Sequence, residues 1–105
     1  MDPVITARHC EVTPELRRRA AEIVQRISLL AGRPMETSVV FDVEAGQSTA
    51  ELRLHVAQGD VFIAGGDGPD HGTALDRAEE KLRSQVDRAA GRTRDVRHSA
   101  ELNQV

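Results

Sequence analysis

Apolar residues recur at helical spacing in two segments of this chain and at strand spacing between them, and this change of period constrains the fold most. The chain has 105 residues, which is enough for one core. At 100° per residue the first helical set falls in one arc of about 120°. The first stripe is Leu16, Ala20, Ile23, Val24, Ile27, Leu30 and Ala31, and the second is Leu75, Ala78, Leu82, Val86 and Ala89.

Capping and turn residues predict where the elements begin and end. Thr13 can cap a helix that has Pro14 in its first turn, and Gly32 supplies its stop. Glycine-rich residues 65–70 predict a loop, in which Asp70 caps the second helix. Strands are expected at residues 4–10, 38–44, 50–57 and 61–64.

The order of these elements predicts the topology. The long connection through the first helix makes the first two strands parallel, and the short turns that follow make an antiparallel meander. Each helix has one apolar stripe, so both helices must cover the same sheet face. We therefore expect an α+β two-layer sandwich of order β-α-β-β-β-α, with a four-stranded sheet and two helices on one face. Residues 1–92 would form this domain, and residues 93–105 a polar C-terminal tail.

Composition excludes several classes of protein. Fractions of 39% hydrophobic and 30% charged residues fit a globular chain. No apolar run approaches the roughly 20 residues that cross a bilayer, and the first residues do not resemble a signal peptide, so we expect a cytoplasmic protein without a membrane partner. The single cysteine, Cys10, cannot form an internal disulfide or a set of thiolate ligands.

The arrangement of the charges is compatible with a phosphate-binding edge despite a net charge of -3, but does not by itself decide for one. On the second helix, one basic flank of about 60° is separated from an acidic flank. A solvated helix of mixed charge is the alternative reading. Two phenylalanines, with no Trp or Tyr, argue against base stacking, so contacts would be to the nucleic-acid backbone. The basic flank is Arg77, Lys81, Arg88 and Arg92, and the acidic flank is Asp76, Glu79, Glu80 and Asp87.

Nothing in the sequence predicts catalysis, a metal site or a cofactor. His9 and Cys10 would point to opposite faces of a strand, so a structural role is expected for both. Residues 65–68 lack the Gly-Lys-Ser/Thr ending of a phosphate-binding loop, and the carboxylates Asp67 and Asp70 do not make a cation cage. We expect no enzyme activity and no small-molecule substrate.

Several short motifs, in order and nearly without gaps, resemble the ribosome hibernation-promoting factor and ribosome-associated inhibitor family, also called the sigma-54 modulation family. They are Ile5-Thr6-Ala7-Arg8-His9, Glu11-Val12-Thr13-Pro14, Leu16-Arg17, Leu54-His55-Val56, Asp67-Gly68-x-Asp70, Ala74-Leu75-Asp76, Lys81-Leu82 and Gln85. The resemblance implies a non-enzymatic protein that binds the small ribosomal subunit and its rRNA, in the channel for messenger and transfer RNA, and holds idle ribosomes inactive.

The resemblance also implies which residues bind rRNA, and here the chain departs from the family at some positions. Acidic or neutral residues stand where the family commonly has Lys or Arg, at Glu22 or Ile23, Asp42 and Ser84, and Gly72 replaces an aromatic residue. A protein-interaction module that kept the fold but lost strong RNA binding is the alternative function. With Arg77, which the basic flank of the second helix adds, the candidate rRNA-binding residues are Arg8, Arg17, Arg26, Arg77, Lys81, Arg88 and Arg92.

Overall fold

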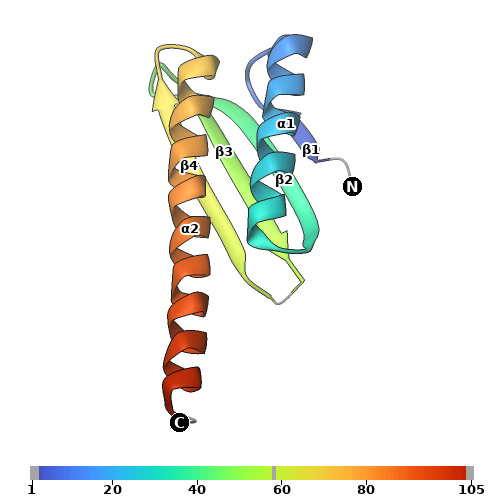
Figure 1. Cartoon of the computed structure of the whole chain (residues 1–105). Helices are drawn as coiled ribbons and strands as arrows, with labels where there is room; N and C mark the ends of the chain where they lie inside the picture. The colour runs from blue at the N-terminus through green and yellow to red at the C-terminus, as the bar shows by residue number, and fades with distance from the viewer. Residues whose placement is uncertain (1–2, 58, 104–105) are drawn as a thin grey trace.

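The structure is a computed structural model that describes residues 3–57 and 59–103, with side chains described to residue 89. Its elements are β1 (Val4–Ala7), α1 (Pro14–Ala31), β2 (Pro34–Glu44), β3 (Gln47–Val56), β4 (Val61–Gly68) and α2 (His71–Asn103). The sheet order is β1-β2-β3-β4, with β1 parallel to β2 and antiparallel pairing elsewhere. The α+β sandwich predicted from the sequence is confirmed (Figure 1).

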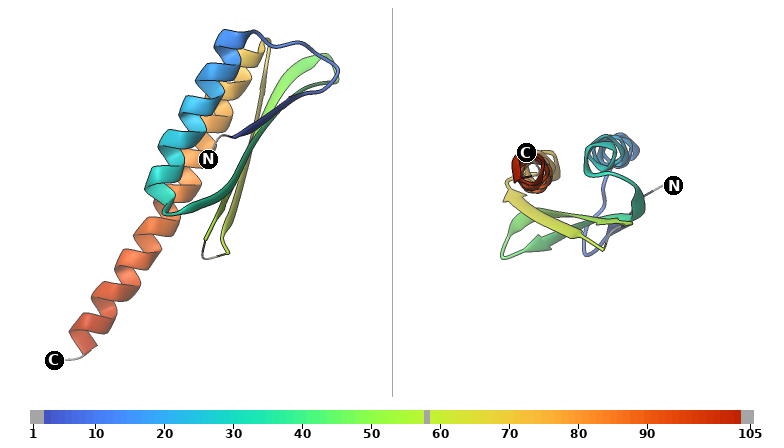
Figure 2. Two further views of the ribbon diagram at one scale, coloured as in Figure 1. Left: turned by 90° about the vertical axis from the view of Figure 1, so that its right-hand side faces the viewer. Right: turned by 60° about the horizontal axis from the view of Figure 1, so that its bottom comes forward.

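Both helices lie on the same side of the sheet, as the single stripe on each helix predicted (Figure 2). The core between the two layers is built from side chains of both helices and of β2, β3 and β4. Its largest fully buried members include Phe41, Leu52, Ile27 and Leu82. No helix in the described ranges is long and apolar enough to cross a membrane.

The predicted limits of α1 are confirmed by its caps. The Leu16 amide donates to Thr13 Oγ1 at 3.1 Å, and Pro14 occupies the first turn. Gly32 ends the helix at φ 114°, a conformation that other residues rarely adopt. Leu30 was expected in the core but is 55% exposed, because it lies at the margin of the helical arc, turned away from the sheet.

The first strand ends earlier than the sequence predicted, because His9 has a left-handed backbone conformation with φ 57°. The chain therefore leaves the sheet after Arg8, whose amide still donates to the Phe41 carbonyl at 2.8 Å, and the expected alternation of His9 and Cys10 across a strand is wrong. Val43 lies on the same face of β2 as Phe41 but is 40% exposed, because it is close to the turn at the end of the strand. That turn needs only Ala45 and Gly46, both with positive φ, which is typical of a tight type I′ hairpin.

The expected glycine-rich loop is wrong, since β4 continues to Gly68. Gly65 pairs with Glu51, and Gly66 pairs with Ala50. A Cβ atom on Gly66 would lie 2.3 Å from the Ala74 carbonyl oxygen, so glycine here lets α2 approach the sheet. Gly66 and Gly68, which look like part of a loop in the sequence, therefore lie where the strand meets the helix. The Asp70 cap is confirmed, because the Thr73 amide donates to Asp70 Oδ1 at 2.7 Å.

Candidate nucleic-acid interface

One flank of α2 is fastened to the free edge of β4 by three side chains, which we call the edge ladder. Arg77 Nη1 donates to the Asp67 carbonyl at 2.6 Å, and Lys81 Nζ donates to the Gly65 carbonyl at 2.9 Å. Gln85 Nε2 donates to the Ile63 carbonyl at 2.9 Å. The ladder thus joins every fourth helix residue to every second strand residue.

The helix and the strand have matching repeats, which explains this regular ladder. Four helical residues rise about 6 Å, and two strand residues span nearly the same distance. Because α2 runs antiparallel to β4, each step along the helix meets the next outward carbonyl on the strand. The ladder satisfies backbone acceptors that an edge strand would otherwise leave to solvent or to another chain.

The ladder leaves positive charge exposed on the surface. Arg77 and Lys81 bond to neutral carbonyls, and an ammonium or guanidinium group has further N–H donors beyond the one used. Arg88 is exposed on the same flank, where it lines shallow hollows beside Lys81 and Gln85. None of these three cations makes an ion pair with any side chain in the described part of the chain.

The predicted residues of α1 are not brought to this flank. Arg17 is half-buried and donates to the Ile5 carbonyl of β1 at 3.4 Å, at the opposite edge of the sheet. Arg26 is exposed and lies seven residues after Arg19, hence on the flank of α1 that faces α2. Arg8 is exposed after β1. The side chain of Arg92 lies outside the described residues.

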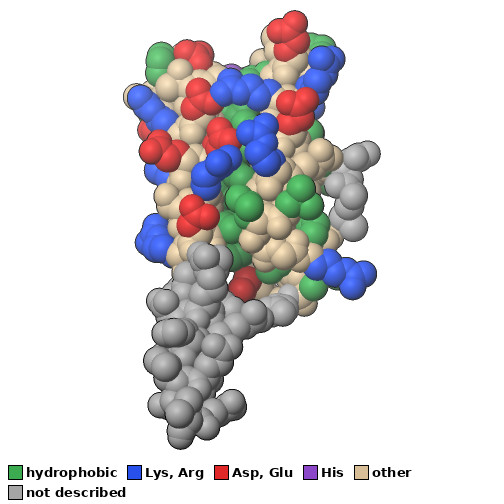
Figure 3. Space-filling model, viewed as in Figure 1, with side chains coloured by type: hydrophobic (Ala, Val, Ile, Leu, Met, Phe, Trp, Pro, Cys, Tyr) green, Lys and Arg blue, Asp and Glu red, His purple; other side chains and the backbone are tan. Residues whose placement is uncertain are grey.

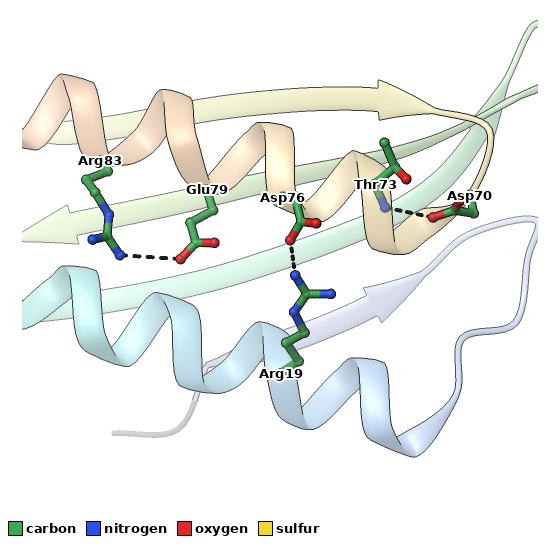
Figure 4. A network of polar contacts seen from close by, with 6 residues as sticks. All are labelled: Arg19, Asp70, Thr73, Asp76, Glu79 and Arg83. Atoms are coloured by element: carbon green, nitrogen blue, oxygen red, sulfur yellow. Dashed lines mark hydrogen bonds and ion pairs between the residues drawn. The ribbon is translucent and has the colours of Figure 1, made fainter.

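One ion pair crosses between the two helices in the described structure, and a second lies along α2 (Figure 4). Arg19 of α1 contacts Asp76 of α2, and Arg83 bonds Glu79 on the same helix at 3.4 Å. Blue and red side chains are accordingly interspersed over the helices (Figure 3). One positive ridge across both helices is therefore not formed. Arg77, Lys81 and Arg88 form a group of cations without ion pairs in the described structure, and this group lies along the edge ladder.

A polar cluster joins the end of β2 to the start of α2. His9 Nδ1 lies 3.0 Å from Asp42 Oδ1, and the Val43 amide donates to the same oxygen at 2.7 Å. The hydrogen bond with His9 is the main reason that the pKa of Asp42 is lowered from its usual value. His71 Nε2 donates to the Asp42 carbonyl at 3.0 Å and meets Phe41 edge-on. The departure from the family at Asp42 thus has a structural role here.

Sequence reasoning grouped Arg77, Lys81 and Arg88 correctly on one flank but missed what holds them. Gln85 carries no charge, so it was named only as part of a family motif and not as a member of the basic flank. Its spacing of four residues from Lys81 would have placed it on that flank. The pairing of Arg19 with Asp76 joins residues 57 apart and had no local signal. No group of three or more His, Cys, Asp or Glu side chains within the described ranges is arranged to hold a metal ion.

A family model identifies the family of this chain, and solved structures share its fold. Residues 4–94 match the model of the family described as sigma 54 modulation protein / S30EA ribosomal protein. A search of curated proteins gives no match.

Two solved structures share the fold. A ribosomal subunit interface protein from Coxiella burnetii has a TM-score of 0.76 at 16% identity, covering 87% of this chain and 99% of that one. The N-terminal domain of Protein Y from Thermus thermophilus has a TM-score of 0.70 at 22% identity, covering 84% and 98%.

Proposed function

Because the chain belongs to the sigma 54 modulation protein / S30EA ribosomal protein family, we propose that it is a ribosome-associated translation inhibitor, a hibernation factor. It binds the rRNA of the small subunit in the channel used by messenger and transfer RNA, and keeps idle ribosomes inactive by occupying that space. The observation that carries this proposal is the edge ladder with Arg88, a row of exposed cations on a net-acidic chain.

The ladder suits the backbone of RNA better than its bases. Arg77 and Lys81 stand about 6 Å apart along α2, which is comparable to the spacing of successive phosphates on an RNA strand. Their carbonyl partners hold both side chains at the strand edge, so less side-chain entropy is lost when a phosphate binds. Arg88 extends the same flank, and Arg92 would follow it at helical spacing in the sequence. Arg8, Arg17 and Arg26 would make separate contacts from the α1 side.

A protein-interaction module without strong RNA binding is the second candidate. It is favoured by the ion pair of Arg19 with Asp76, which removes one cation from the surface between the helices. The two candidates differ in a direct measurement. A hibernation factor pellets with small ribosomal subunits at low salt, whereas the interaction module stays in the supernatant.

Co-sedimentation with small ribosomal subunits across a salt series tests the proposed function. We expect Lys81→Glu combined with Arg88→Glu to abolish pelleting, because both side chains are exposed and each phosphate contact adds to the salt dependence. Lys81→Gln combined with Arg88→Gln removes the two phosphate contacts without adding negative charge. For this variant the plot of log affinity against log salt concentration should be less steep, by about 1.5 in the magnitude of its slope.

A matched control removes the effect of net charge. Arg18→Glu with Arg33→Glu changes the charge equally at two exposed positions away from the edge ladder. This control should pellet more strongly than the Lys81→Glu and Arg88→Glu variant. Equal losses in both variants would show that net charge alone matters, and wild type remaining in solution at low salt would refute the function.

A further inference from the structure

The sheet face opposite the helices, which we call the open sheet face, is uncovered in the described structure (Figure 2). The pleat turns alternate residues of each strand towards it. Its apolar members include Val4, Val61 and Ile63, which are 62%, 44% and 47% exposed. Its charged members include the carboxylates Glu36, Asp42, Glu44, Glu51 and Asp67 and the guanidinium of Arg53.

A hollow of about 340 Å³ interrupts this face at β4. Gly65 stands opposite Glu51 in the pairing of β3 with β4, and Asp67 stands opposite Thr49. Because Gly65 has no side chain, the space between the two carboxylates is left open. Glu44 adds a third carboxylate to the lining, and Lys81 reaches the hollow from the strand edge.

The open sheet face repels RNA and attracts cations. Three carboxylates face one ammonium at the hollow, and apolar side chains lie on the same surface. Phosphates approaching this side would meet like charge, so RNA is confined to the helix side and the β4 edge. A surface that combines carboxylates, apolar side chains and a cavity of side-chain size is instead complementary to a basic protein segment.

We propose that the open sheet face binds an extended, basic protein segment in which cationic and apolar side chains alternate. One Lys or Arg of the segment enters the hollow between Glu51 and Asp67, and its apolar neighbours pack on Ile63 and Val61. This inference goes beyond the proposed function and does not depend on it, since the binding is measured without ribosomes.

The probe is a fluorescent synthetic peptide of alternating lysine and leucine, titrated with the purified full chain. Glu51→Lys with Asp67→Lys should weaken binding at least about tenfold, because two attractive contacts become repulsive. Gly65→Val fills the hollow without changing the charge and should also weaken binding. A Cβ at Gly65 has only the Ala50 carbonyl oxygen near it, at 3.9 Å, so this variant should fold.

A matched control separates this surface from a general effect of charge. Glu22→Lys with Glu80→Lys makes the same change at two exposed positions on the helices and should leave peptide binding nearly unchanged. Equal weakening by this control, or unchanged binding after Glu51→Lys with Asp67→Lys, would overturn the proposal. Thermal melts of each variant check that the fold is intact.

Lys81→Met gives a second, independent readout. It removes the one cation at the hollow and one cation of the edge ladder, so peptide binding should strengthen while ribosome pelleting weakens. If peptide binding weakens or does not change, the proposed docking surface is wrong, whereas pelleting reports on the proposed function alone. The wild-type chain could instead self-associate and fail to bind the peptide. If Glu51→Lys then abolishes the self-association, the occupant of the open sheet face is a second copy of the chain, and the proposal is overturned.

Discussion

Replacing Gly66 by alanine tests whether close contact between α2 and β4 holds the edge ladder in place. An added Cβ would lie 2.3 Å from the Ala74 carbonyl oxygen and 2.7 Å from the Ala78 amide nitrogen. Both are backbone atoms of α2, so no change of rotamer can relieve the clash. The helix must move away from the strand, which disturbs the core contacts of Ala74 and Ala78, both fully buried.

The size of the effect follows from overpacking. Inserting a methyl group into a close-packed site costs about 1–3 kcal/mol, and a contact with rigid backbone belongs at the upper end. Gly65→Ala is the matched control, because the same methyl group meets nothing closer than 3.9 Å. There the loss of backbone freedom in the unfolded chain should stabilise the protein by about 0.4–1 kcal/mol. The two variants should therefore differ by about 3 kcal/mol.

Urea denaturation followed by circular dichroism measures this difference. We expect the midpoint of Gly66→Ala to fall well below wild type, and that of Gly65→Ala to equal or exceed wild type, with similar slopes for all three proteins. In thermal melts a loss of about 2 kcal/mol corresponds to roughly 10 °C. Equal midpoints for the two alanine variants would refute the reasoning, since the close approach at Gly66 would then carry no energetic cost.

Three further predictions concern local contacts. Thr13→Ala removes the acceptor for the Leu16 amide and should cost about 1 kcal/mol in urea melts, whereas Thr13→Ser should retain most of the stability. Because the pKa of Asp42 is lowered in the folded protein, its carboxylate stabilises the fold above the usual value of 3.8, and this contribution is lost as the pH falls through the lower, folded value. Asp42→Asn should therefore make stability less dependent on pH in that acidic range, and an unchanged acid denaturation curve would contradict this. A double-mutant cycle with Arg19→Ala and Asp76→Ala should give a coupling below about 1 kcal/mol, since both side chains are about half exposed.

The edge ladder gives the same side chains two roles. Arg77 and Lys81 satisfy outward carbonyls of β4 and also carry the exposed charge of the proposed RNA-binding flank. Glutamine at either position can still donate to the carbonyl but carries no charge, so it separates the structural role from the electrostatic one. A glutamine variant should fold as stably as wild type and lose affinity for ribosomes.

Local patterns in the sequence determined most of the architecture. The caps at Thr13 and Gly32, the stripes of both helices and the alternation in β3 depend on neighbouring residues, and the topology followed from the lengths of the connections. The basic flank of α2 was also predictable, because helical geometry places residues four apart on the same side.

Only the tertiary structure decided the role of residues 65–68 and the distribution of positive charge. Glycine is typical both of loops and of strands that touch another backbone, and the position of α2 over β4 selects the second role at Gly66. Likewise, whether the charge of an arginine stays unpaired depends on partners far away in the sequence, as with Asp76 for Arg19. Such partners meet through packing of the two layers, which a local pattern does not encode.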